Sequence, residues 1–572
     1  MLSSPNQRWL DDFVTKHNRP PRVLHIGNIA NNAYNNAKIL RQAGLHSDVI
    51  CYDYYHMMGC PEWEDADFED GAYGNDFKPN WQKANIKNFK RPNWFVQGRL
   101  DDCQNFLIAK SENNKLQMAQ DWENLSRDNG TFGYSCYTNY DTTNRKRKLI
   151  KSLQLRLSWL KRTLYYYYLG LERNVTASSN SDRMIDRASG SLMKLGLYGI
   201  WLIYKFYSAS KSILRRYVID NLASNYKTRY ERLAQERFFN SRAHEFARQF
   251  RDEFPDRSNQ LAPSEINVYR YTIPKWRKVL NHYDIVIAYS TLTVIPYICK
   301  KEYFGFEHGT LRDIPYVDDS QGKLTTLSYR FAKHAFVTNF DCVESAQYLT
   351  QNRFTTINHP YDEDHGKNIS GHQQLRNSLK EELASEFLFF HPTRQDWVEG
   401  KGYADKNNDV FIKAFISLKK AGHKVGLVCC NWGHNVKQTQ ALLDRSGCSP
   451  YVKWISPLAI TPFERMCLAS DVVVDQFKLG AFGGVLFKAL SVGAPVLTYL
   501  DEEAVLEQYA ECPPVINCKT GQQLVERLEP LIYQHDALLE IGKNGRAWIE
   551  KYHSKIGTVN KQVDQFREHY KS

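Results

Sequence analysis

Short apolar runs alternate with amphipathic stretches at the start of the chain. Residues 22–27 (RVLHIG) and 48–52 (DVICY) are apolar runs typical of buried strands, and residues 33–43 between them have a helical pattern that ends at Gly44. A strand, a tight loop, a helix and a second strand predict a parallel sheet. The signals that complete this sheet lie at residues 284–289, 294–300, 303–306 and 334–338.

The same order of signals returns in the last third of the chain. A strand is predicted at residues 387–391, a helix at 408–421 and a second strand at 424–430. The later signals lie at residues 452–455, 462–469, 542–552 and 558–570. We therefore predict an α/β fold with two Rossmann-like domains that face a cleft, because ligands of such sheets bind at the carboxyl edges of the strands. The break at Asn358–Tyr361 is the predicted linker, which gives domains of residues 1–360 and 361–557.

The middle of the chain departs from this pattern. Residues 61–140 are polar and show no clear period, so we expect long loops there. Residues 98–270 separate the two parts of the first sheet, and we interpret them as a mainly helical, basic insertion in the first domain. Residues 141–220 hold 16 Lys and Arg against 5 Asp and Glu, an excess of 11 in a chain whose net charge is +12.

The basic segment at residues 145–220 combines cations with apolar and aromatic side chains. Only ten uncharged residues separate Lys194 from Lys205, which is too short to span a bilayer but suits a helix in the headgroup plane. We favour an anionic membrane surface as its partner. A helical hairpin packed on the protein's own core and a nucleic-acid contact are the alternatives, and nothing else in the chain is typical of a nucleic-acid module.

Composition narrows the class of protein further. With 42% hydrophobic and 24% charged residues, the chain is typical of a soluble globular protein. Its twelve cysteines form no CxxC pair and no cluster at zinc spacing, which predicts a reducing compartment and no metal site. The N-terminus lacks the apolar run of a signal peptide, and we expect a cytoplasmic protein, peripheral at the inner face of the cell membrane.

A glycine-rich stretch at residues 471–503 is the clearest candidate for chemistry. It reads as an apolar strand, a loop with Gly480, Gly483 and Gly484, a helix, a Gly-Ala-Pro stop and a second strand. The N-terminus of that helix would point its free N–H groups into the loop, which favours a phosphate. A plain tight turn is the alternative interpretation.

Several motifs together resemble the GT-B glycosyltransferases, specifically the retaining family 4-like group. They are FFHPTRQDWVEGKG, LASDVVVDQF, GAFGGVLFKALSVGAPVL and GRAWIEKYHS, and the resemblance covers about residues 20–60 and 275–572. It implies a nucleotide-sugar donor on the second domain, a glycan or lipid-linked acceptor on the first, and no cofactor. It also implies that the last helix, residues 558–572, packs back on the first domain.

The resemblance assigns donor-side roles to several residues. Arg394 and Lys401 match the diphosphate-binding positions, where cations stabilise the departing phosphate if no metal does. Surface salt bridging is the alternative for both. Phe482, Gly483 and Gly484 match the loop that cradles the diphosphate.

Acceptor-side and catalytic roles fall in the first domain. His308, after Glu307 in FEHG, matches a histidine near the transferred sugar, where it would bind a hydroxyl or carry a charge; a structural histidine is the alternative. The acceptor-side loop matches Gly27, Asn28, Asn31 and Asn32, whose amides would otherwise satisfy turn backbone. Retention in this group is explained by front-face attack with the leaving phosphate as base.

The chain departs from the group at a pair of glutamates, which are replaced by Gly480 and Lys488. A lysine in the first turn of a helix opposes the macrodipole. It becomes favourable if Lys488 faces a phosphate or an acidic sugar; a solvated lysine is the alternative. We predict a metal-independent hexosyltransferase that extends a lipid-linked or surface polysaccharide, such as capsule or lipopolysaccharide. A non-catalytic scaffold in a polysaccharide assembly complex is the alternative.

Overall fold

The first half of the described chain forms a parallel sheet of seven strands. The computed structural model describes residues 2–128, with short gaps between 53 and 88, and residues 233–398 and 405–570. The sheet order is β5-β2-β1-β6-β7-β8-β9, and every pair is parallel. The bounds are β1 Arg22–Ile26, β2 His46–Cys51, β5 Phe95–Gln97, β6 Ile285–Tyr289, β7 Phe304–Glu307, β8 His334–Val337 and β9 Phe354–Thr356.

The second half forms a parallel sheet of six strands in the order β12-β11-β10-β13-β14-β15. The bounds are β10 Phe387–His391, β11 Val425–Cys430, β12 Val452–Ile455, β13 Val472–Val474, β14 Val496–Thr498 and β15 Ile516–Asn517. In both sheets the first strand is central and the chain builds first one side and then the other. This doubly wound order creates a switch point beside β1 and another beside β10, where ligands of such sheets bind.

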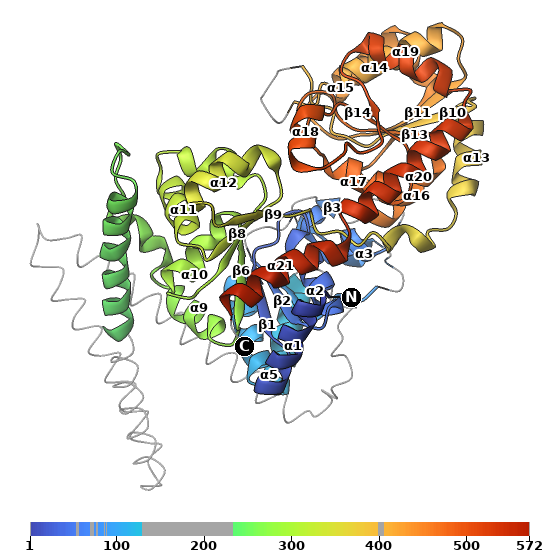
Figure 1. Ribbon diagram of the computed structural model, residues 1–572. Helices are drawn as coiled ribbons and strands as arrows, with labels where there is room; N and C mark the ends of the chain where they lie inside the picture. Colours follow the sequence, from blue (N-terminus) through green and yellow to red (C-terminus); the bar gives the residue numbers. More distant parts are fainter. Residues whose placement is uncertain are drawn as a thin grey trace, which may run out of the picture. The chain divides into compact units, whose positions relative to one another are not determined.

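Helices cover both sheets (Figure 1). Those of the first half include α1 Ser4–His17, α2 Asn32–Gln42, α3 Pro61–Asp65, α4 Leu100–Ser111, α5 Lys115–Asp128, α9 Ile273–Leu280, α10 Val294–Ile298, α11 Ser320–Arg330 and α12 Val343–Thr350, and residues 233–253 are helical as well. Those of the second half are α13 His372–Glu382, α14 Asp409–Lys420, α15 Val436–Arg445, α16 Ile460–Ala469, α17 Gly484–Ser491, α18 Glu502–Gln508, α19 Gly521–Leu531 and α20 His535–Tyr552. The last helix, α21 Lys555–His569, packs against α1 and α2.

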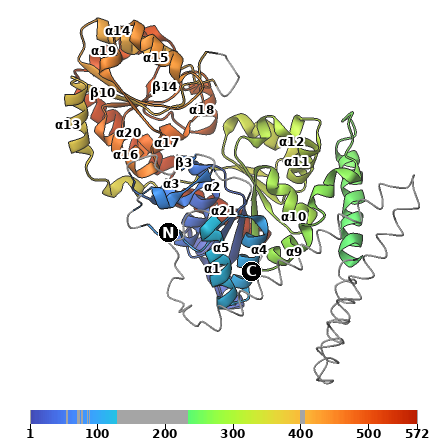
Figure 2. The ribbon, with the colours of Figure 1, turned by 180° about the vertical axis from the view of Figure 1, so that it is seen from behind.

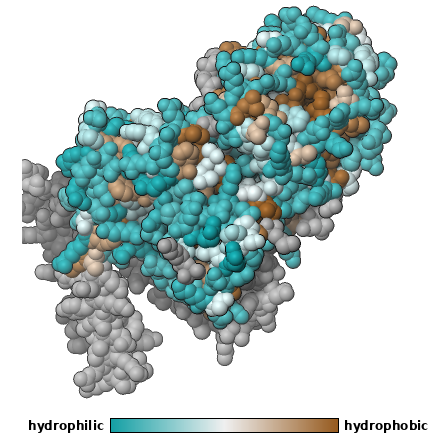
Figure 3. All heavy atoms as spheres, viewed as in Figure 1, coloured by the Kyte–Doolittle hydropathy of each residue, from teal (hydrophilic) through white to brown (hydrophobic). Residues whose placement is uncertain are grey.

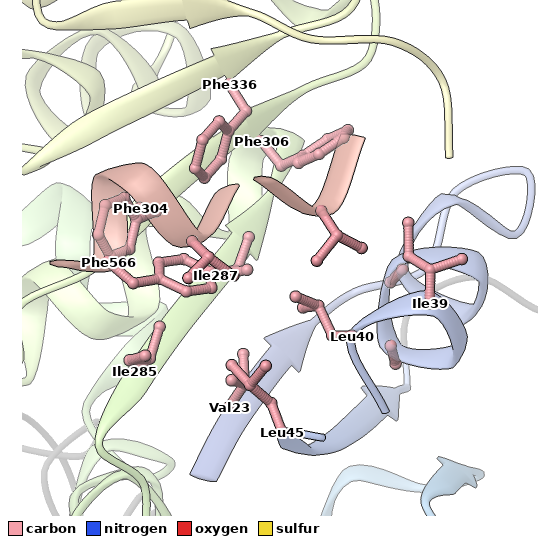
Figure 4. Packing of buried hydrophobic residues seen from close by; sticks show 14 of the residues in the cluster. Val23, Ile39, Leu40, Leu45, Ile285, Ile287, Phe304, Phe306, Phe336 and Phe566 are labelled. Carbon is pink, nitrogen blue, oxygen red and sulfur yellow. The ribbon is translucent and has the colours of Figure 1, made fainter. Parts of the chain in front are cut away.

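The core of the first sheet explains why α21 lies there. Strand side chains such as Ile287, Phe304 and Phe336 are fully buried, and Phe566 of α21 packs among them (Figure 4). The rings of Phe304 and Phe566 lie 5.2 Å apart in an edge-to-face arrangement. Burying one such aromatic side chain contributes roughly 1.5–3 kcal/mol, so the end of the chain is held by the same core as β1.

The predicted fold class, α/β with two Rossmann-like domains as in GT-B proteins, is confirmed by the two sheets. Apolar side chains show on the surface over the second sheet, around β11, β13 and β14 (Figure 3).

Among the described residues, no helix has both the length and the apolar character needed to cross a bilayer. The basic segment at 145–220, and with it the predicted membrane contact, lies outside the described residues.

The long loops predicted for residues 61–140 are wrong for residues 95–128, and residues 129–140 lie outside the described residues. This region contains the edge strand β5 and two helices, α4 and α5, that pack on each other, and α4 also contacts α9 (Figure 2). Because α4 contacts β2 and β5 as well, residues 100–128 belong to the first domain. The insertion predicted at 98–270 therefore begins too early.

Candidate functional site

The switch point of the second sheet gathers charged side chains from two loops. Arg394 follows β10, and its Nη1 lies 3.4 Å from Asp396 Oδ2. Its guanidinium also lies 6.0 Å from the ring centroid of Trp432, which follows β11. The arginine side chain is 37% exposed, so it remains accessible to a ligand while Asp396 and Trp432 restrict its orientation.

A second cation at this edge is Lys406, which the sequence analysis missed. Lys406 lies just before α14, and its Nζ donates a 2.8 Å hydrogen bond to Gln476 Oε1, in the loop after β13. Burial lowers the pKa of Lys406, partly offset by the charge of Asp475. Gln476 in turn donates to the carbonyl of Ala481 at 2.9 Å, so Lys406 is tied to the glycine-rich loop. The predicted Lys401 lies outside the described residues, and its role stays a prediction.

The glycine-rich loop leads directly into α17. Gly483 is the N-cap and Gly484 the first residue of this eight-residue helix, as predicted. Gly480 has a φ of +70°, and a Cβ there would lie 3.0 Å from the Tyr499 ring and 3.1 Å from Asp501 Cβ. A glutamate at this position would therefore be strained, which is a local structural reason for the glycine.

Lys488 and Phe482, two other predicted donor-side residues, lie in surroundings that differ from those expected. Lys488 lies in the last turn of α17 and not in the first, so its charge favours the macrodipole and the predicted conflict is wrong. Lys488 is half-buried, and its ammonium forms no ion pair or hydrogen bond with the described residues. Phe482 packs its ring on Phe487 and Trp548, at centroid distances of 5.4 and 5.9 Å. Its contacts thus hold the loop on the domain, and contact with a donor stays a prediction.

His308 lies at the carboxyl end of β7, in the first domain. Asn32, the first residue of α2, donates its amide to His308 Nδ1 at 2.7 Å. This bond makes Nδ1 the acceptor and leaves the proton of a neutral ring on Nε2. Burial, reinforced by the positive charge of Arg312, lowers the pKa of His308 to about 4. The ring is therefore neutral at pH 7 and suited to donate a hydrogen bond rather than to carry charge.

In the predicted acceptor-side loop, the asparagine side chains form hydrogen bonds with backbone groups of the protein itself. Asn28 donates to the carbonyl of Gly59 at 2.8 Å and accepts from the Tyr34 backbone N–H at 3.0 Å. Asn31 donates to the carbonyl of Cys60 at 2.9 Å. Both asparagines are fully buried, so they fix the loop against the segment before α3. Their contact with an acceptor stays a prediction.

Gly27 and Glu307 also serve the local structure. Gly27 has a φ of +91°, and a Cβ would lie 2.6 Å from Leu292 Cδ1. Glu307 is fully buried; its carboxylate accepts from the Gly309 backbone N–H and from Asn339 Nδ2, the latter at 3.2 Å. Burial raises the pKa of Glu307 despite these donors. The carboxyl thus shapes the turn that carries His308.

Aromatic rings connect His308 to α17. The ring centroids of His308 and His359 lie 5.3 Å apart, and His359, in the connection between the two sheets, lies 5.8 Å from the ring of Phe487. Burial and the nearby charge of Lys488 both lower the pKa of His359, burial most strongly. The structure therefore brings together His308, His359 and α17. It also ties Lys406 to the loop before α17, and Arg394 lies near enough to Lys406 for its charge to lower the Lys406 pKa.

Comparisons with known proteins find only distant likenesses. No protein-family model and no curated protein matches the chain. Among solved structures, HepE of Anabaena in complex with UDP and glucose is 17% identical, over 52% of this chain and 82% of that one, with a TM-score of 0.40. Sucrose-phosphate synthase of Thermosynechococcus elongatus is 12% identical over 52% and 78%, with a TM-score of 0.40. A glycosyltransferase of Rickettsia africae is 12% identical over 54% and 82%, also with a TM-score of 0.40.

Proposed function

We propose that the protein is a glycosyltransferase that binds the diphosphate of a nucleotide sugar between Arg394, Lys406 and the N-terminus of α17. The observation that carries this proposal is Lys406, which is tied to the loop that leads into a helix N-terminus, with Arg394 near enough for its charge to act on Lys406, at the switch point of a parallel sheet. Each group favours negative charge where the sugar–phosphate bond would break. The motifs that resemble the retaining family 4-like group support the same reaction.

In this reaction the neutral His308 binds a hydroxyl of the transferred sugar through Nε2–H, held by the bond from Asn32 to Nδ1. The chain's cations stabilise the phosphate as it leaves, without a metal. The proposal includes retention of configuration and an acceptor that is a lipid-linked or surface polysaccharide at the inner face of the membrane. Retention rests on the sequence resemblance, and the membrane acceptor on the basic composition of residues 145–220.

Lys488 supports the proposal that the donor is an acidic nucleotide sugar. This half-buried residue forms no ion pair with the described residues, and its charge acts on His359, which contacts His308. A cation near the transferred sugar favours an acidic sugar, such as a uronic acid, over a neutral one. Lys488→Glu should therefore lose affinity for acidic nucleotide sugars while retaining neutral ones. An unchanged preference contradicts the acidic-donor proposal.

A screen of nucleotide sugars for thermal stabilisation tests the proposed function. A ligand at 100 times its Kd stabilises the folded state by about 2.7 kcal/mol. We expect stabilisation by at least one nucleotide sugar and its loss in Arg394→Ala and Lys406→Ala. Lys413→Ala is the matched control, because Lys413 is an exposed lysine on α14 that pairs only with Asp409 among the described residues. Failure of every nucleotide sugar to stabilise the protein would contradict the proposal.

A non-catalytic scaffold is the second candidate, and the absence of a glutamate at both Gly480 and Lys488 favours it. The two functions differ in turnover. The enzyme should release nucleoside diphosphate from the stabilising nucleotide sugar when a glycan acceptor is present, and His308→Ala should slow that release. A scaffold should bind partners or nucleotide sugar without releasing nucleoside diphosphate.

A further inference from the structure

Asp475 is a buried carboxylate beneath the loop that leads into α17. It directly follows β13 and is 3% exposed. Thr393 Oγ1 donates to Asp475 Oδ1 at 3.2 Å, and the backbone N–H of Leu486, in the first turn of α17, also donates to this carboxylate. Asp475 Oδ2 is buried and accepts no hydrogen bond from any residue that the structure describes.

The position of Asp475 Oδ2 is fixed by the loop itself. A Cβ built on Gly483, the N-cap of α17, would lie 2.7 Å from this oxygen. The carboxylate therefore lies directly behind the backbone that would face a phosphate. A helix N-terminus attracts negative charge. At α17 the carboxylate of Asp475 already interacts with this positive end of the helix dipole.

A phosphate at the same helix end would bring a second negative charge close to the first. Two anions that share one site cannot both stay ionised at low cost, and one of them binds a proton. The cation whose charge acts on Asp475 is Lys406, and its Nζ is held by Gln476, the residue after Asp475. Lys406 and Arg394 together supply two positive charges, which are fewer than the negative charges of a carboxylate and a nucleoside diphosphate together.

We propose that Asp475 takes up a proton when a phosphate group binds at the N-terminus of α17, so that the occupied site contains a neutral carboxyl. The proposal rests on the phosphate site of the proposed function. The proton comes from the solvent and is carried by Asp475, while every other bond is unchanged. Asp475 is a positioning residue: it lies behind the loop and acts on the ligand through charge.

The surroundings of Asp475 favour this proton uptake. Burial raises the pKa of Asp475 before any ligand binds, although Lys406, Thr393 and the Leu486 N–H oppose the rise. The other ionisable group at the end of β10 is His391, whose Nδ1 lies 3.1 Å from the Val474 carbonyl oxygen. Burial lowers the pKa of His391 to about 4, so this ring is neutral near pH 7. Asp396, another buried carboxylate at this edge, pairs with Arg394 and His434, whereas Asp475 has no ion pair among the described residues.

Isothermal titration calorimetry of the full chain with UDP, at pH 7 in two buffers of different ionisation enthalpy, measures the proton uptake. We expect the wild type to take up more protons than Asp475→Asn, with a difference that approaches one proton. The variant should bind UDP about tenfold more tightly at pH 8, the effect of one pKa unit of coupling. Its affinity should also depend less on pH than that of the wild type.

Two further variants show whether the proton is taken up by Asp475 or by Lys406. Lys406→Arg stays charged at every pH, so proton uptake that persists in this variant does not come from Lys406. Thr393→Val removes a donor that lowers the pKa of Asp475, and it should shift the uptake to higher pH even if Asp475→Asn fails to fold.

The outcomes distinguish this inference from the function on which it rests. If UDP binds with the same proton uptake and pH dependence in the wild type and Asp475→Asn, the inference is wrong and the phosphate site stands. If the asparagine variant does not fold, an unshifted profile in Thr393→Val overturns the inference instead. If neither UDP, ADP nor GDP binds the wild type, both the proposed function and this inference are overturned.

Discussion

Two adjacent glycines at the start of α17 should respond in opposite directions to the same substitution. A Cβ on Gly483 would lie 2.7 and 3.2 Å from the two carboxylate oxygens of Asp475. That carboxylate is buried and held by Thr393, so it cannot easily move away. Overpacking of this kind costs about 1–3 kcal/mol. A Cβ on Gly484 meets nothing within 4 Å among the described residues, and alanine there should stabilise the fold by about 0.4–1 kcal/mol.

Thermal unfolding of Gly483→Ala and Gly484→Ala measures the difference. With about 2–4 °C per kcal/mol for a domain of this size, Gly483→Ala should lower the Tm by several degrees and Gly484→Ala should raise it slightly. Adding Asp475→Ala should recover much of the loss in the Gly483→Ala background and none in the other, as in a double-mutant cycle. Equal Tm values for the two alanine variants would refute the contact between the loop and Asp475.

Two further predictions concern buried charges away from the loop. Arg91 and Glu62 form a bidentate pair at 2.7 and 2.8 Å with both side chains buried, so Arg91→Met should cost about 3–5 kcal/mol in urea unfolding, and Arg91→Met with Glu62→Leu should recover most of it. Burial lowers the pKa of His365, but a 2.8 Å hydrogen bond with Glu464 and nearby carboxylates raise it overall. The stabilising effect of protonated His365 should be complete below about pH 6.5 and lost as pH rises through the raised pKa. A stability–pH profile that is the same in His365→Gln as in the wild type would contradict this contribution.

The strands and the glycine-rich loop could be predicted because their signals are local. Apolar runs such as 387–391 are buried on both faces in a parallel sheet, and such runs identify a strand without knowledge of its neighbours. Gly483 and Gly484 were placed correctly because glycine, helix start and strand lie within a dozen residues. The helix α4 could have been found as well, since Cys103, Phe106 and Leu107 have helical spacing and are buried.

The rest of the site depends on contacts between distant residues. Lys406 is one of many lysines in the sequence, and what distinguishes it is a bond to Gln476, which lies 70 residues further along the chain. Asp475 at a strand end looks like an ordinary loop residue until its burial beneath Gly483 is known. The pairing of Asn32 with His308 arises because β1 and β7 both lie next to β6 in the sheet.

The central claim is that the N-terminus of α17, with Arg394 and Lys406, binds the diphosphate of a nucleotide. Calorimetric titration of the wild type, Arg394→Ala and Lys406→Ala with the nucleoside diphosphate that stabilises the protein best tests it most directly. Hydrogen bonds to charged groups are worth about 1.5–3 kcal/mol, so each substitution should weaken binding about 10- to 100-fold, while Lys413→Ala should leave it unchanged. Equal affinity in all four proteins would contradict the account.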